Sequence, residues 1–319
     1  MQTANQAFTQ PRQEPEIERR RAQRRRLISE SLVGYAFLAP SVLLFTVFIA
    51  IPIILTVSVL SFSNYSLLAP MKFTGLDNYR ALFADPDFST VMLNTFKFIS
   101  FIAPLHIVLG LALAVGVNAM KNKVFKGLYR TVFYFPLVVT TASIAIVWGY
   151  MFDYNFGVFD YYLRRLDLAP IHWLTSTSWS LLTVAIFSAW KFIGNAFLYY
   201  LIGLQNIPES YSEAASIDGA SAAQIFFKIK LPLLTPILFF VITITLINCF
   251  QMFDEPYFLT KGGPGVSSQT MAMHIYRKGF GEFQIGYAST LGVVLFILVL
   301  VVTFIQFSQQ KKWVSNDFE

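Results

Sequence analysis

The sequence of 319 residues has one cysteine, Cys249, only three histidines, and few charged residues, 13% of the total. A single cysteine excludes an internal disulfide and the paired-cysteine frameworks that hold structural zinc. The three histidines, His106, His172 and His274, are far apart in the chain, whereas a metal or catalytic site needs clustered side chains. We therefore predict neither catalytic nor metal-binding residues, and we assign these histidines to packing or to the surface.

The shortage of charge is matched by an excess of apolar residues, 55% of the chain. Average globular proteins have about a quarter of their residues charged, and a soluble core of this length cannot use so much apolar surface. The apolar residues also fall into runs of the length that crosses a bilayer, roughly 20 residues. We predict an all-α integral membrane protein with six transmembrane helices, at Gly34–Leu60, Leu93–Val117, Thr131–Met151, Leu181–Leu204, Leu233–Phe253 and Tyr287–Phe307.

The first 32 residues form an arginine-rich arm. A basic run of this kind is found in nucleic-acid-binding proteins, but beside a membrane span it is typical of an orientation signal. The apolar run that follows is too long for a cleaved secretory signal. We expect three parts: the arm 1–32, a six-span transmembrane domain 33–308, and a tail 309–319.

Lys and Arg residues between the spans predict the orientation. Fifteen lie on the side of the two termini and seven on the other side. Because basic residues are enriched in cytoplasmic loops, we expect both termini to be cytoplasmic. The outer segments 62–92, 152–180 and 254–286 can then either dock a soluble partner or cap the bundle.

The loop 205–232 is the only long cytoplasmic loop in this topology. Pro208 suits a first helical position, and Glu209 follows in the first turn, where an acidic side chain is favourable. Gly219 can supply a positive φ where one short helix turns into the next. Phe226 and Ile229, three residues apart, share a helix face. The pattern predicts a helix-turn-helix on the cytoplasmic face, shaped to fit a cleft.

This loop resembles the cytoplasmic signature of the permease subunits of binding-protein-dependent ABC importers. The matching residues are Glu213, Ala214, Ala215, Gly219, Ile229, Leu231 and Pro232. The resemblance implies that the segment forms coupling helices in a groove of an ATPase subunit, that Glu213 makes a polar contact there, and that Gly219 shapes the turn. It further implies a bacterial or archaeal cell membrane, two ATPase subunits that bind ATP and Mg²⁺, a second and unlike permease subunit, and an external solute-binding protein. No cofactor on this chain and no nucleic-acid partner are expected.

Other motifs are similar to the carbohydrate-uptake branch of that family. They are Ala36-x-x-x-Pro40, Gly75-Leu76-Asp77-Asn78-Tyr79, and Leu259-Thr260-x-Gly262-Gly263-Pro264. The branch handles oligosaccharides, related sugars and glycerol phosphate esters, so the resemblance implies transport of a sugar or sugar-like solute. The glycine cluster at 262–265 lacks the Lys-Ser/Thr that follows the last glycine of a phosphate-binding loop. We interpret it as an external turn and expect ATP hydrolysis on separate subunits.

Polar side chains inside spans are costly in lipid and usually face a cavity or another helix. The candidates for contact with solute are Trp190, Lys191, Phe192, Asn195, Asn248 and Gln251. Hydrogen bonding between helices is the alternative for the amides. Lys191 suits an anionic phosphate ester, but it can equally pair with Asp254 or Glu255 around a neutral sugar.

Three other functions fit the sequence less well. An ion-driven secondary transporter favours internal repeats and buried acids, and neither pattern is evident. A membrane assembly protein without a transport path leaves the signature of the loop unexplained. An ABC exporter more often carries its ATPase in the same chain.

Overall fold

The computed structural model describes residues 16–66 and 69–314, which are mostly helical. The chain divides into two compact units, Met1–Thr56 and Val57–Glu319. Part of the predicted basic arm 1–32, including Arg12, lies outside the described residues, as does the end of the predicted tail 309–319.

The first unit is built on one long helix. Helix α1 (Glu16–Phe45) contains Pro40 and continues through a π-helical turn (Thr46–Ala50) into α2 (Ile51–Ser58). The apolar part, Glu30–Phe62, is long enough to cross a membrane, and none of the residues in its most apolar window is buried inside the protein. Its apolar surface is therefore available to lipid or to another chain.

The second unit contains the other helices with the length and composition of membrane spans. Three are continuous and two are bent pairs of helices, and they are α4 (Pro86–Asn118), α8 (Ser180–Asn206), α15 (Ile285–Trp313), α5 with α6 (Lys123–Val138 and Thr141–Met151), and Ala222–Leu233 with α12 (Thr235–Phe250). The described residues thus contain four continuous spans, or six if each bent pair crosses once. The predicted helical membrane fold is confirmed. The predicted span Thr131–Met151 is broken after Val138, whereas the second bend lies at Leu234, at the start of the predicted span Leu233–Phe253.

The break between α5 and α6 bends the chain by 99°. Pro136 lies in the last turn of α5, and Val139 then ends the helix in an extended conformation. The Nζ of Lys191 on α8 donates a hydrogen bond of 2.8 Å to the carbonyl oxygen of Val139. A backbone carbonyl freed from a helix is costly in an apolar environment unless it finds a donor, so Lys191 stabilises the bend.

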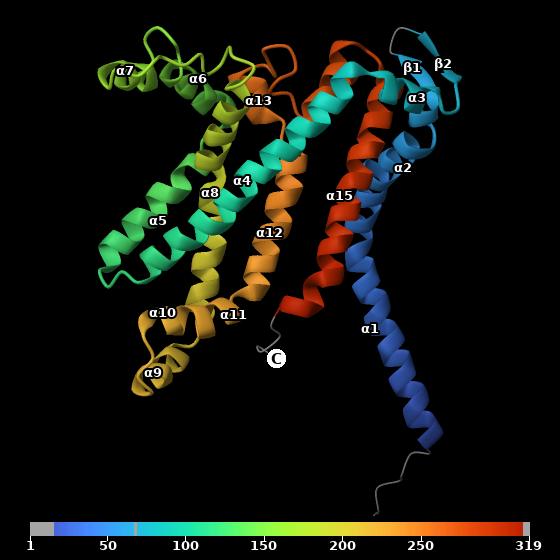
Figure 1. The fold of residues 1–319 in the computed structure, drawn as a ribbon. Coiled ribbons are helices and arrows are strands. Elements are labelled where there is room, and N and C mark those ends of the chain that lie inside the picture. The colour runs from blue at the N-terminus through green and yellow to red at the C-terminus, as the bar shows by residue number, and fades with distance from the viewer. Residues whose placement is uncertain (1–15, 67–68, 315–319) are drawn as a thin grey trace, which may run out of the picture. The chain divides into compact units, whose positions relative to one another are not determined.

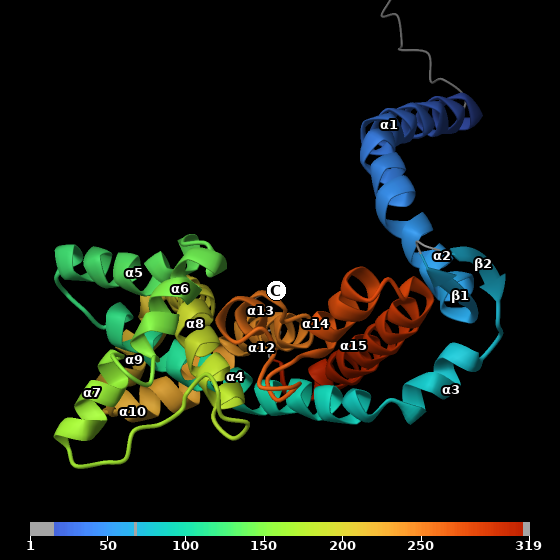
Figure 2. The same ribbon diagram turned by 90° about the horizontal axis from the view of Figure 1, so that it is seen from above.

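Helices α4 and α8 pack side by side and form the centre of the second unit (Figure 1). A Cβ added at Gly110 on α4 would lie 2.8 Å from the Cβ of Ala196 on α8, so the glycine permits this close approach. Small residues let helix backbones come together in membranes. Seen from above, α4 extends from α3 past α15 and α12 to α8 (Figure 2).

Short elements cap both ends of the second unit. Figure 1 shows α9, α10 and α11 at one end and α3, α6, α7, α13 and the two strands at the other. The shorter elements of this unit are β1 (Ser63–Ser66), β2 (Ala69–Phe73), α3 (Asp77–Ala84), α7 (Val158–Arg165), α9 (Glu209–Ile217), α10 (Ala222–Ile225), α11 (Leu231–Leu233), α13 (Asp254–Leu259) and α14 (Met271–Tyr276). Further π-helical turns lie at Phe226–Lys230 and Arg277–Gly281.

The strands β1 and β2 form an antiparallel hairpin that the sequence did not predict, with Ser63 opposite Phe73. Asn78 on α3 holds its base, because the Nδ2 donates to the carbonyl oxygens of Ser61 and Ser63 at 3.0 and 2.9 Å. The Gly75–Tyr79 motif is thus structural here. Its asparagine ties the segment after the first span to the start of α3.

The glycine cluster at 262–265 forms a turn at the same end as α13. Gly262 and Gly265 have φ values of +79° and +60°, which favour glycine. Asn94 on α4 holds the segment after this turn, donating from its Nδ2 to the carbonyl oxygen of Val266 at 2.8 Å. The predicted turn is present, and it packs against α4.

Candidate functional site

The loop between α8 and α12 folds as two short helices joined by a tight turn, as the sequence predicts. Helix α9 begins after Pro208, with Glu209 in its first turn. Ser221 and Gln224 form a capping box that starts α10. The capping box satisfies amide donors that the helix start leaves free. Local sequence therefore specifies both helices of the loop.

Gly219 makes the turn between these helices. Its φ is +81°, and its amide donates to the carbonyl oxygen of Ser216 at 3.1 Å, while that of Ala220 donates to Ala215 at 2.9 Å. These two bonds form a Schellman motif, in which the residue after the helix takes a left-handed conformation. A Cβ at Gly219 would meet no atom within 4 Å. The backbone conformation, rather than a lack of space, favours glycine here.

The two sides of this loop differ in exposure. Glu213 and Ala214 are exposed, and Ile217 is 87% exposed. Tyr211 and Phe227 of the same loop are exposed as well, and exposed apolar side chains that gather on one surface are a candidate contact for a partner. Among the other predicted coupling residues, Gly219 and Pro232 are exposed, and four are half-buried, namely Ala215, Phe226, Ile229 and Leu231. The exposed side of α9 is thus free to meet another chain.

The base of the loop is fixed to the helices that flank it. Ile207 and Leu234, at the two ends of the loop, are buried in the same cluster as Tyr200 of α8 and Val241 of α12. Close-packed interiors have low compressibility and transmit strain. A force on α9 is therefore carried into α8 and α12 together.

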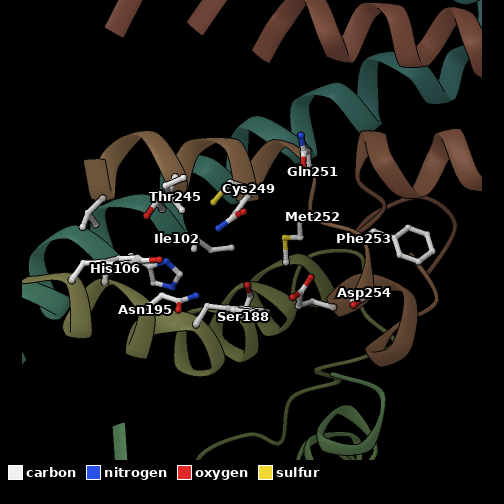
Figure 3. Close-up of a pocket in the computed structure, with 17 residues that line it drawn as sticks. Ile102, His106, Ser188, Asn195, Thr245, Cys249, Gln251, Met252, Phe253 and Asp254 are labelled. Atoms are coloured by element: carbon white, nitrogen blue, oxygen red, sulfur yellow. The ribbon is translucent and has the colours of Figure 1, made fainter. Parts of the chain in front are cut away.

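A cavity of about 350 Å³ lies between α4, α8, α12 and the start of α13. Figure 3 shows His106, Ser188 and Asn195 on one side of this space, facing Thr245 and Cys249 on the other. The complete lining is Ile102, His106, Ser188, Phe192, Asn195, Ala196, Tyr199, Val241, Ile244, Thr245, Asn248, Cys249, Gln251, Met252, Phe253, Asp254 and Glu255. Apolar rings, amides and hydroxyls are the groups that bind a sugar, which has an apolar ring face and many hydroxyls.

Four of the six predicted solute residues line this cavity: Phe192, Asn195, Asn248 and Gln251. Their spacing explains the agreement, because residues three and four apart share one helix face. Whether they contact solute is not tested by this geometry and stays a prediction.

Trp190 and Lys191 are not part of the lining that the described residues form. Trp190 packs its indole against Trp148, with ring centroids 4.9 Å apart. Lys191 is 2% exposed and donates to Val139 at the break after α5. Adjacent residues of a helix point in different directions, so Phe192 enters the cavity while the two residues before it do not.

The sequence did not identify His106, Ser188 and Thr245 as cavity residues. His106 is buried, as expected of a packing residue, with Nε2 3.3 Å from the carbonyl oxygen of Ala189, and it also lines the cavity. Helical spacing could have found Ser188, seven residues before Asn195, and Thr245, three before Asn248. Nothing in the sequence places α4 beside them.

The other two histidines lie at the same end as α13. His172 stacks on Tyr154 with ring centroids 3.9 Å apart. His274 is fully buried, with Nε2 3.6 Å from Oδ2 of Asp85. Burial lowers the pKa of His274, and the nearby Asp85 carboxylate opposes that shift. His274 is thus packed in the interior and His172 lies at the surface, and both positions agree with the expectation.

Glu255 is the buried acid of the cavity wall, at 5% exposure, and Asp254 beside it is exposed. Burial raises the pKa of the Glu255 carboxyl to about 7, and the neighbouring Asp254 adds to this shift while Lys191 opposes it. The carboxyl can therefore donate or accept hydrogen bonds near neutral pH.

Known proteins resemble this chain in sequence and in fold. The sequence model of the family described as "Binding-protein-dependent transport system inner membrane component" matches residues 106–314. This range includes the loop and every lining residue of the cavity except Ile102.

Curated relatives match over nearly the whole chain. The probable ABC transporter permease protein YesP of Bacillus subtilis is 36% identical, over 92% of this chain and 95% of its own. The arabinooligosaccharides transport system permease protein AraP of the same organism is 33% identical, over 87% and 88%. A chain of a bacterial alginate ABC transporter, solved with an alginate pentasaccharide-bound periplasmic protein, has the same fold, with a TM-score of 0.77, 22% identity, and coverage of 90% and 96%.

Proposed function

Because this chain belongs to the family of binding-protein-dependent transport system inner membrane components, we propose that it is the permease subunit of an ABC importer for a sugar or sugar-like solute. The name of the arabinooligosaccharide relative supports the solute class. The cavity supports it too, because its lining combines aromatic rings with amides and hydroxyls. Phe192, Asn195, Asn248 and Gln251 are the proposed contacts to the solute.

One observation carries this proposal: the exposed loop and the cavity are built on the same two helices. Helix α8 lines the cavity with Asn195 and runs into α9, while α12 lines it with Asn248 and begins just after α11. The buried cluster at the base of the loop joins the two helices. A partner that moves α9 therefore also moves both walls of the cavity. Alternating access by rigid elements needs such a connection.

The proposed partner at the loop is an ATPase subunit that binds ATP and Mg²⁺, with Glu213 and Ile217 on the surface that meets it. In this proposal the loop and both termini lie in the cytoplasm of a bacterial or archaeal cell, and the excess of Lys and Arg on the side of the termini supports this orientation. The cavity then opens toward a second permease subunit, and an external binding protein delivers the solute. This chain supplies the path, and the ATPase subunits supply the energy.

The proposal is tested by reconstitution in liposomes of the transporter purified from its own membranes with all co-purifying subunits. We expect ATP-dependent accumulation of a sugar from a panel of labelled neutral and acidic oligosaccharides. We expect neither ATP hydrolysis nor accumulation from this chain alone. Hydrolysis by the isolated chain, or an intact assembly that accumulates no sugar, would refute the proposal.

Charge reversal at the loop tests the proposed contact. Glu213→Lys should lower the amount of ATPase that co-purifies, because it reverses a charge on the exposed side of α9. The matched control is Asp77→Lys, since Asp77 is an exposed acid on α3, at the other end of the second unit. Equal ATPase recovery from both variants would exclude this surface as the contact.

A further inference from the structure

The charged side chains in the cavity wall are of one sign. Among the described residues that line it, Asp254 and Glu255 are acids, and there is no lysine or arginine. The acids are adjacent in sequence, at the start of α13. The rest of the lining consists of apolar and uncharged polar side chains and the imidazole of His106. The described lining therefore contains no lysine or arginine side chain that could form an ion pair with an anionic solute.

Lys191 is the basic residue near these acids, and it is buried outside the cavity lining. Lys191 interacts electrostatically with both Glu255 and Asp254. Its Nζ donates to the carbonyl oxygen of Val139 and lies 4.8 Å from the ring centroid of Phe192. Because Lys191 is only 2% exposed, a solute in the cavity cannot form an ion pair with it unless the α5–α6 break is rearranged. Lys191 reduces the negative charge of the wall without offering a binding site for an anion.

We infer that the solute site, if the proposed function holds, takes an uncharged sugar and rejects an anionic one, and that Glu255 is the residue that determines this specificity. A carboxyl binds sugar hydroxyls through both oxygens. A carboxylate or phosphate on the solute would lose its water beside Glu255 without gaining an opposite charge, which is strongly unfavourable in a site of low dielectric constant. Specificity then comes from repulsion of the wrong solute as well as from contacts to the right one.

The single cysteine gives a direct probe of this charge. Cys249 lines the cavity, and no other cysteine occurs in the chain. In the purified transporter, Cys249 is treated with the cationic reagent methanethiosulfonate-ethylammonium or with its anionic ethylsulfonate analogue, and modification of this chain is followed by mass spectrometry. Each rate is divided by the rate of the same reagent with free cysteine. The ratio of the two normalised rates cancels the reactivity of the thiol itself.

The rates are measured at about pH 8, where the Glu255 carboxyl is mostly ionised because its pKa is about 7. We expect the cationic reagent to be favoured by roughly tenfold or more, from the Coulomb interaction at protein-like dielectric constants. Glu255→Gln should bring the ratio toward one, and Glu255→Asp should preserve it. The control Asp77→Asn removes an acid from the exposed surface of α3 and should leave the ratio unchanged. A wild-type ratio of one or less, or a ratio that Glu255→Gln does not lower, would overturn the inference.

Cys249 is 5% exposed, so a second probe position guards against slow labelling. Gln251 also lines the cavity and is exposed. If neither reagent modifies Cys249, the same ratio is measured on Gln251→Cys in a Cys249→Ala background, with the same expectations.

Uptake separates failure of this inference from failure of the proposed function. The reconstituted transporter is given neutral trisaccharides and trigalacturonate. Uptake that is limited to neutral sugars supports the inference. Uptake of trigalacturonate as fast as of any neutral sugar overturns it and leaves the proposed function intact. If no sugar is taken up, the proposed function fails, and the labelling ratio still decides whether this cavity repels anions.

Discussion

Replacement of Gly219 by valine tests the proposed coupling role of the loop 205–232 through its backbone alone. The residue has a φ of +81°, and a Cβ there would meet no atom within 4 Å. The substitution thus introduces no clash with a neighbouring element. It introduces only the local cost of a left-handed conformation, about 1–2 kcal/mol for an L-residue. For a β-branched side chain, which is restricted at χ1, the cost lies at the upper end of that range.

A cost of this size changes the population of the turn, because about 1.4 kcal/mol is a factor of ten in an equilibrium constant. When the Schellman turn opens, the amides of Gly219 and Ala220 lose their bonds to the carbonyl oxygens of Ser216 and Ala215. Helix α9 then no longer presents Glu213 at a fixed angle to α10. We expect Gly219→Val to lose most of the coupling and Gly219→Ala to lose less. Gly219→Asn should lose least, since asparagine tolerates this conformation.

The assay is paired: ATPase recovered by pull-down, and solute taken up per ATP hydrolysed. Gly127→Val is the control, because Gly127 on α5 also has open space around it but has no positive φ. It should behave like the wild type in both measurements. Normal recovery and normal coupling for Gly219→Val would show that the geometry of this turn does not transmit the work of the ATPase.

Three further variants address the cavity and the packing. Asn195→Ala removes an amide from the cavity. It should weaken apparent solute affinity by about fivefold, or on the order of 1 kcal/mol, with assembly unchanged. Unchanged uptake kinetics would instead assign the amide to helix–helix bonding. Gly194→Ala places a methyl group against the carbonyl oxygen of Phe133. We expect the free energy of unfolding to fall by about 1–3 kcal/mol, measured as a lower melting temperature. Gly116→Ala is the control, because Gly116 has open space around it, and it should be neutral or stabilising. Burial raises the pKa of Glu255 to about 7 from its ordinary value of 4.5. The folded state therefore holds more protons between these pH values, and stability falls as pH rises through this window. Glu255→Gln should flatten this fall in melting temperature, and an identical pH profile for the variant would contradict the raised pKa.

The parts of this fold that the sequence predicted are those that depend on neighbouring residues. Pro208, Gly219 and Ser221 specify the loop between α8 and α12 through caps and a turn, so its two helices follow from the local pattern. The long apolar runs likewise predicted the regions of the spans. Their ends differ because helices continue past the apolar stretch; α4, for instance, begins at Pro86, seven residues before the predicted span.

The cavity could be predicted only in part, because its lining comes from several helices whose placement beside one another the sequence does not show. Spacing along α8 and α12 identified Asn195, Asn248 and Gln251, since those residues share faces within their own helices. It did not reveal that His106, on α4, lies opposite Thr245 across the cavity (Figure 3). That placement depends on the close contact of α4 with α8 at Gly110 and Ala196, which involves residues far apart in the sequence.

Lys191 shows how one physical rule can support two different interpretations of the same residue. A lysine in the middle of a span is costly, which made it a candidate for binding solute. The same rule applies to a free backbone carbonyl in an apolar environment, and Val139 presents one where α5 ends. The two costs offset each other in the 2.8 Å hydrogen bond between them. The sequence contains both signals, a lysine in one span and Pro136 in another, but only the packing of α5 against α8 shows that they belong together. Once Lys191 is engaged there, the acids at the start of α13 determine the charge of the cavity wall that this chain supplies.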